Sequence, residues 1–150
     1  METKEKIEQL MDAAVVSNLD GIELFAQYNI DTIRESYNGI GPEFFPAELR
    51  AKVTEHLAIF EPAALLHDLR NEFSDGTRWS FNYANYEFHE NCLRLANRKY
   101  PWYSWRRYAA RHVAHLLYKF VSGENGWRAW IEAKERHAKK MQKKDKNNES

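Results

Sequence analysis

Residues 61–71 read EPAALLHDLRN, a stretch that predicts one helix carrying an adjacent histidine and aspartate. Pro62 suits the first helical position, where the N–H group that proline lacks is not needed. A buried stripe at helical spacing is predicted for Leu65, Leu66, Leu69 and Phe73. His67 falls about 100° round the helix from Leu66, on a small, polar flank shared with Asn71. That flank leaves room for a ligand, although a packed and hydrogen-bonded histidine explains the same pattern.

The composition fits one domain. The chain has 150 residues, enough to bury a substantial core. Lysine plus arginine and aspartate plus glutamate each total 22, so the net charge gives no case for a specific nucleic-acid partner. Five Trp, eight Tyr and eight Phe favour a core built of large rings. We expect a helical domain at 1–133, followed at 134–150 by a basic tail that frays or is disordered.

Cysteine usage and hydropathy indicate a cytoplasmic location. Cys92 is the only cysteine, so no internal disulfide can form, which is usual in a reducing compartment. The first 16 residues are charged and amphipathic rather than of the signal-peptide type. No run approaches the about 18 apolar residues of a membrane span. Association with a virion is a second possibility for the location.

Hydrophobic periodicity predicts an all-α fold, a single-domain helical bundle with short connections. No alternating pattern typical of a strand extends beyond a few residues. Helices are expected at 3–17, 22–36 (with a break near 29–31), 47–59, 62–75, 80–97 and 104–121, and from 127 onward. Ser80 and Ser104 are the expected N-caps of the fifth and sixth of these helices. The segment 123–126 is expected to break the chain before the last one.

A glycine-rich loop and the His-Asp helix can form one site. Residues 37–42 read YNGIGP, and glycines at alternate positions allow backbone carbonyls to converge on one point. A hard cation such as Ca²⁺ binds carbonyl oxygens together with a carboxylate, which Asp68 could supply. His67 would face a neighbouring position as a general base. Asn85, on the edge of the apolar stripe of the next helix, is placed to orient the imidazole.

These motifs resemble the phospholipase A2-like superfamily. Residues 37–41 (YNGIG) are similar to its Tyr-x-Gly-x-Gly calcium loop, and residues 63–68 (AALLHD) are similar to its catalytic helix. Residues 84–88 (ANYEF) look like the Ala-Asp-x-x-Phe segment of cysteine-poor viral and phage-type members. The segment 108–130 is similar to the helical end of small phage-associated proteins. The resemblance implies an antiparallel helix pair of the phospholipase A2 type.

The resemblance also implies roles for individual residues. In that family the histidine activates a water that attacks a glycerophospholipid ester, and Ca²⁺ stabilises the developing oxyanion. By position, His67 would be the base, Asn85 would orient it, and Asp68 would be the calcium carboxylate. The carbonyl ligands would come from Tyr37, Gly39 and Gly41. A phospholipid surface would be the partner, and no protein partner is indicated.

Two departures from the family pattern weaken the implied activity. Asn71 stands where the family has Tyr, and Asn85 stands where it has Asp. An amide accepts a hydrogen bond from imidazole but cannot stabilise an imidazolium by charge. Two functions are therefore predicted: a Ca²⁺-dependent phospholipid ester hydrolase with a weakened or lost site, or a non-catalytic helical binding or structural protein of phage or mobile-element origin.

Other polar clusters have simpler explanations. His112 and His115, and the group Glu87, His89 and Glu90, lack further ligands at standard metal spacing, so packed or solvated side chains are expected. The aromatic and basic segment 100–108 could meet a membrane interface or stack on bases, but packing partly in the core and partly on the surface is the simpler reading. The lysine-rich tail is read as a solubilising end, with weak contact to anionic lipid or RNA as the alternative.

Overall fold

The fold is all-α, as the sequence predicted. The computed structural model describes residues 2–39 and 47–149, and this part of the chain contains no strand. The helices, in order, are α1 (Lys4–Val16), the 3-10 helix η1 (Ile22–Ala26), α2 (Ile30–Ser36), α3 (Ala47–Thr54), α4 (Leu57–Glu72), α5 (Arg78–Lys99), α6 (Trp105–Ser122) and α7 (Glu124–Glu149). None of the described helices is both long and apolar enough to cross a bilayer.

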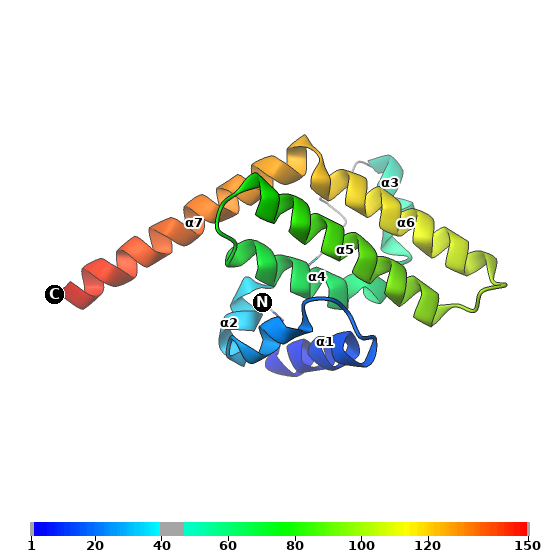
Figure 1. Ribbon diagram of the computed structural model, residues 1–150, viewed down its shortest axis with the longest axis horizontal. Helices are drawn as coiled ribbons and strands as arrows, with labels where there is room; N and C mark the ends of the chain where they lie inside the picture. The colour runs from blue at the N-terminus through cyan, green and yellow to red at the C-terminus, as the bar shows by residue number, and fades with distance from the viewer. Residues whose placement is uncertain (1, 40–46, 150) are drawn as a thin grey trace.

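Three antiparallel helices make the centre of the bundle. Figure 1 shows α4, α5 and α6 running side by side, with short turns joining α4 to α5 and α5 to α6. The helices α1 and α2 pack on α4, while the short α3 contacts α6. The first part of α7 contacts α4 and α6, and its basic end projects away from the bundle (Figure 1). The His-Asp stretch on α4 therefore lies in the central part of the bundle, next to α5.

Side-chain caps fix where several helices begin. The hydroxyl of Thr3 accepts from the N–H of Lys6 at 3.2 Å, and the amide oxygen of Asn29 accepts from the N–H of Thr32 at 2.8 Å. The hydroxyl of Ser104 likewise accepts from the N–H of Arg106 at 3.2 Å, as predicted for that cap. Asn29 begins α2, so the expected break near 29–31 is confirmed.

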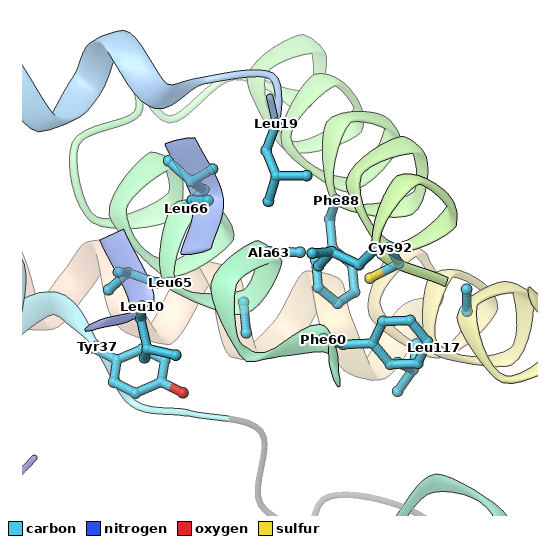
Figure 2. Close-up of a cluster of buried hydrophobic side chains, with 14 of the residues drawn as sticks. Leu10, Leu19, Tyr37, Phe60, Ala63, Leu65, Leu66, Phe88, Cys92 and Leu117 are labelled. Carbon is cyan, nitrogen blue, oxygen red and sulfur yellow. The ribbon is translucent and has the colours of Figure 1, made fainter. Parts of the chain in front are cut away.

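The core lies where α1, α4, α5 and α6 meet. Figure 2 shows its side chains converging on one another from these helices. Leu65 and Leu66 of α4, Cys92 of α5 and Phe60 are all fully buried. Burial of side chains this large contributes roughly 1.5–3 kcal/mol each, relative to leaving them exposed. Leu65, Leu66 and Leu69 of the predicted stripe thus form the face by which α4 joins the bundle. The prediction is wrong for Phe73, which is the C-cap of α4, is 37% exposed and stacks on Tyr28 outside the core.

A part-buried ion pair joins α4 and α5. The Arg70 guanidinium donates from Nε to Glu87 Oε1 at 3.1 Å and from Nη2 to Glu87 Oε2 at 2.9 Å, while Glu87 is only 3% exposed. Burial raises the pKa of Glu87, and the hydrogen bond and charge of Arg70 oppose that rise. The same carboxylate packs against Gly21, whose φ of +96° is in the left-handed region. One contact thus joins α4, α5 and the turn before η1.

A second buried side chain holds that turn. Asn91 of α5 is fully buried. Its Oδ1 accepts from the N–H of Asp20 at 2.8 Å, and its Nδ2 donates to the carbonyl of Asp20 at 2.9 Å. Both polar groups of the Asp20 backbone are therefore satisfied inside the protein.

Helix ends in the middle of the chain differ from the sequence prediction. Pro62 is the sixth residue of α4, not the first, because the apolar segment from Leu57 is already helical and buries Phe60. The proline forgoes only one N–H···O bond. The expected helix at 47–59 divides, since α3 ends at Thr54 and α4 begins at Leu57. Thr77, rather than Ser80, caps α5, because its hydroxyl accepts from the N–H of Ser80 at 3.1 Å.

The last helix is longer than predicted at both ends. It begins at Glu124, directly after the Gly123 C-cap of α6, and it continues through the basic segment to Glu149. Lys134 Nζ donates to the carbonyls of Glu72 at 3.0 Å and Ser74 at 2.8 Å. These carbonyls lie at the end of α4, where a cation interacts favourably with the helix dipole. Tertiary contacts thus support the part of α7 around Lys134.

Candidate functional site

His67 and Asn85 are in direct contact. The Nε2 atom of His67 on α4 and the Oδ1 atom of Asn85 on α5 are 2.7 Å apart. Asn85 is only 1% exposed, and its Nδ2 donates to the carbonyl of Val121 at 3.4 Å. That bond turns the amide so that its oxygen faces the imidazole. The contact expected from the sequence is therefore present in the structure.

This geometry decides which nitrogen of His67 carries the proton. An amide oxygen only accepts, so His67 Nε2 must be the protonated nitrogen, and the lone pair of the neutral ring lies on Nδ1. Burial lowers the pKa of His67, and the hydrogen bond to Asn85 opposes that effect. The ring also packs against Phe88, with centroids 4.8 Å apart. A neutral, oriented imidazole with a free Nδ1 lone pair is the form that a general base requires.

Asp68 is bound by the loop that the sequence placed beside it. Its Oδ2 accepts from the N–H of Asn38 at 2.9 Å and from the N–H of Gly39 at 3.2 Å. Burial raises the pKa of Asp68 to about 7, the two N–H groups oppose the rise, and the charge of Glu72 adds to it. The loop and the His-Asp helix are thus adjacent, as the combined motif predicted.

The described part of the loop, Asn38 and Gly39, nevertheless presents the opposite polarity to the one expected. The sequence predicted carbonyl oxygens pointing at Asp68, whereas the recorded contacts come from N–H groups. Gly39 has a φ of +74°, in the left-handed region, after Tyr37 in extended conformation. Successive N–H groups in such a turn converge on an anion, not on a cation. Gly41 lies outside the described residues.

As arranged, the described residues supply only part of the calcium site expected from the sequence. Ca²⁺ takes six to eight oxygen ligands; the Asp68 carboxylate is one of them, and the backbone groups that contact it are N–H donors. Within residues 2–39 and 47–149, no group of three or more His, Cys, Asp or Glu side chains could hold a metal, whereas the expected site combines a single carboxylate with backbone carbonyls. Tyr37 is buried at 8% exposure, and burial together with Glu61 and Asp68 raises the pKa of its hydroxyl. A cation at this place would need the loop to turn its carbonyls inward.

The His-Asp pair opens on a cavity of about 1010 Å³ between α4, α5, α6 and α7. Its polar lining includes His67, Asp68, Asn71 and Asn85 from α4 and α5, and Asn125, Glu132 and Arg136 from α7. Its apolar lining includes Phe81, Phe88, Leu117, Val121, Ala129 and Trp130. A cavity of this size with both polar and apolar lining suits a small amphipathic molecule.

Two buried polar atoms on the cavity wall have no hydrogen-bond partner among the described residues. They are Oδ1 of Asn71 and Nε1 of Trp130. Trp130 is only 4% exposed, so its N–H cannot turn to bulk solvent. Buried polar groups are normally satisfied, and each exception calls for a partner such as water or a ligand. The helical spacing of Asn71 from His67 could predict that Asn71 lies at this site. The sequence could not predict Trp130, because only the packing of α7 brings it to the cavity.

His89 of α5 and His115 of α6 pack on rings, while His112 is exposed. His89 stacks on Tyr118 with centroids 4.7 Å apart, and its ring lies 5.8 Å from that of His115. Glu87, grouped with His89 in the sequence, faces Arg70 instead. Packing of this kind was the simpler of the two readings of these residues.

Comparison with known proteins adds no relative: no family model, curated protein or solved structure matches the chain. The class that the structure defines is an all-α bundle with a histidine-amide pair on a cavity wall.

Proposed function

We propose that the protein has a phospholipase A2-like scaffold with a weakened Ca²⁺-dependent phospholipid ester hydrolase site. The observation that carries the proposal is the 2.7 Å contact between His67 Nε2 and Asn85 Oδ1 on the wall of the cavity of about 1010 Å³. It supports the proposal because it frees Nδ1 of a neutral imidazole to take a proton from water. The apolar part of the cavity lining gives an acyl chain a place to lie.

Three features of the same site account for its weakness. Asn85 carries no charge, so it cannot stabilise the imidazolium that forms when His67 accepts a proton. In a serine protease triad, the corresponding change from Asp to Asn lowers kcat by about 10⁴-fold. Asp68 accepts two N–H groups, and its pKa of about 7 leaves it only partly ionised at neutral pH. Ca²⁺, when bound, would supply positive charge for the oxyanion. The carbonyl ligands that would hold it are not turned toward Asp68 in this arrangement.

The test combines two measurements on wild-type protein. The first is hydrolysis of ester-linked phospholipid vesicles with and without Ca²⁺, and the second is the shift of Tm with Ca²⁺ concentration, since a ligand that binds the folded state stabilises it by mass action. We expect slow hydrolysis that His67→Ala abolishes. His112→Ala on the exposed side of α6 is the matched control and should leave the rate unchanged.

Asn85→Asp tests whether the amide is the weak point. A carboxylate at this position can stabilise the imidazolium, so the variant should hydrolyse the vesicles faster than wild type. The proposal is wrong if neither wild type nor Asn85→Asp hydrolyses the ester and Ca²⁺ shifts neither Tm.

The second candidate is a non-catalytic binding protein of phage or mobile-element origin, and the unpartnered atoms of the cavity favour its binding role. A ligand group that accepts from Trp130 Nε1 and donates to Asn71 Oδ1 would satisfy both atoms. A fluorescent fatty alcohol is a suitable probe, because its hydroxyl can both accept and donate. Under this reading it binds to His67→Ala as it does to wild type, and Trp130→Phe, which removes the N–H and keeps a ring, binds it more weakly. Equal binding by Trp130→Phe would count against this candidate.

A further inference from the structure

Large aromatic rings are exposed around the turn between α5 and α6. Trp102 is 75% exposed, Tyr103 73%, Trp105 71% and Tyr108 68%. Figure 1 shows this turn as the projecting end of the α5–α6 hairpin, remote from α7. We name residues 98–111 the hairpin tip. Clusters of exposed rings of this size mark interaction sites more often than they mark ordinary surface.

The hairpin tip is also positively charged. The sequence contains no Asp or Glu between Glu90 and Glu124. Five cationic side chains lie in the tip: Arg98, Lys99, Arg106, Arg107 and Arg111. Among the described residues, none of the five forms an ion pair.

The recorded hydrogen-bond partners of these cations are neutral. Arg98 donates to the carbonyl of Val16 at 2.6 Å. Arg107 and Arg111 both donate to Oδ1 of Asn97, at 2.9 Å and 2.7 Å. These bonds hold the guanidinium groups in place without neutralising them, so the tip keeps its positive charge for an anionic partner.

We propose that the hairpin tip docks the protein on an anionic phospholipid bilayer. Tryptophan and tyrosine are enriched at the headgroup level of membranes, because one part of each ring is apolar and another is polar. Arginine and lysine are attracted to the negative surface of anionic lipid. A projecting end with both kinds of side chain can meet a flat surface without any change in the bundle.

The ring geometry favours a bilayer over nucleic acid. Single-stranded nucleic acid binds on aromatic rings that offer their faces to successive bases. The rings of Trp102 and Tyr103 are almost perpendicular, at 84°, with centroids 5.7 Å apart, so they form no such platform.

This surface is separate from the cavity and goes beyond the proposed hydrolase. Asn85 and Lys99 lie 14 residues apart on α5, which corresponds to about 20 Å along the helix. Docking therefore does not require His67 to act on an ester, and each proposal can fail without the other.

The experiment measures co-sedimentation of the full chain with vesicles made of ether-linked lipids, which have no ester to hydrolyse. One set is an equimolar mixture of phosphatidylcholine and phosphatidylglycerol, and the other is phosphatidylcholine alone. Wild type should pellet with the anionic vesicles and much less with the neutral ones. Lys99→Glu/Arg106→Glu should weaken binding by at least about 25-fold, since each cation near the surface contributes about five-fold. Trp102→Ser/Trp105→Ser should also weaken it.

Exposure of these side chains makes the variants suitable, because none fills the core. Helical circular dichroism and Tm should stay at the wild-type values. Trp79→Ser is the matched control, since Trp79 on α5 is 71% exposed, like Trp105, but belongs to the opposite end of the hairpin. It should bind vesicles as wild type does.

Several results would overturn the proposal. Wild type that binds neutral and anionic vesicles equally, or not at all, would do so. The proposal would also be wrong if the tip variants bind vesicles as wild type does, while Lys139→Glu/Lys143→Glu on the basic end of α7 loses binding. Binding to a labelled uridine oligonucleotide without binding to vesicles would assign the tip to nucleic acid.

Discussion

Replacing Asp68 by asparagine should make the folded protein less sensitive to pH. The pKa of Asp68 rises from 3.8 to about 7 on folding, chiefly because of burial. The folded state thus holds a proton more tightly than the unfolded chain does, and protonation favours folding. The free energy of unfolding of wild type should therefore fall as pH rises from 3.8 to about 7, and this contribution should stay constant above that. The amide side chain of the Asp68→Asn variant has no proton to lose, while its oxygen can still accept from the N–H groups of residues 38 and 39.

The pKa shift gives the size of the effect. One pKa unit corresponds to about 1.4 kcal/mol. Between pH 5 and pH 8 the Asp68 carboxyl of the folded protein loses its proton. The range from pH 5 to its pKa of about 7 spans about two units, so the free energy of unfolding changes by at most about 3 kcal/mol. Asp68 is partly exposed, and solvent screening reduces this figure to roughly 2 kcal/mol. On going from pH 5 to pH 8, the free energy of unfolding of Asp68→Asn should therefore rise by roughly 2 kcal/mol relative to that of wild type.

The assay is urea denaturation followed by circular dichroism at pH 5 and pH 8, with both proteins in the same buffers. Asp75→Asn is the control. Hydrogen bonds from Ser80 and Thr77 lower the pKa of Asp75 to about 2, so its contribution is already complete at pH 5. It should change stability equally at both pH values. If Asp68→Asn and wild type keep parallel pH profiles, within about 0.5 kcal/mol, the carboxylate does not titrate in the folded state as described.

Three further predictions concern the turn before η1 and the histidine. Gly21→Ala should destabilise the fold by at least about 1–2 kcal/mol, because φ is +96° and the new Cβ would lie 2.8 Å from Glu87 Oε1; an unchanged Tm would refute this. Asn91→Ala should cost about 2–4 kcal/mol in urea denaturation, because it leaves the N–H and carbonyl of Asp20 without partners; a cost under 1 kcal/mol would show that water replaces the amide. The ring protons of His67 should titrate by NMR with a midpoint below 6.5, and a higher midpoint would contradict burial as the cause of the shift.

Much of the fold could be read from local sequence. The periodic apolar residues, the caps Thr3, Asn29 and Ser104, and Gly123 determine most helices and their starts or ends through interactions within a few residues. Local signals failed where packing outweighed them. Pro62 reads as a helix start, yet burial of Phe60 extends α4 upstream past it.

The candidate site shows the same division. Helical spacing placed His67, Asp68 and Asn71 near one flank of α4, and a short connection made α5 a neighbour carrying Asn85. The sequence did not show which backbone group of the glycine loop faces Asp68. Whether an N–H or a carbonyl turns toward the carboxylate depends on φ and ψ at residues 37–39. Glycine permits both N–H and carbonyl groups to turn inward.

The sequence by itself determined the helical class and the apolar face of residues 61–71, because periodicity and caps act over one or two turns. The short connection between the two helices made the pairing of His67 with Asn85 a candidate. Only the tertiary structure decided that N–H groups bind Asp68, that α7 brings Trp130 to the cavity, and that Glu87 faces Arg70. These contacts join residues far apart in the chain. Their geometry follows from how whole helices pack, and no short stretch of sequence records it.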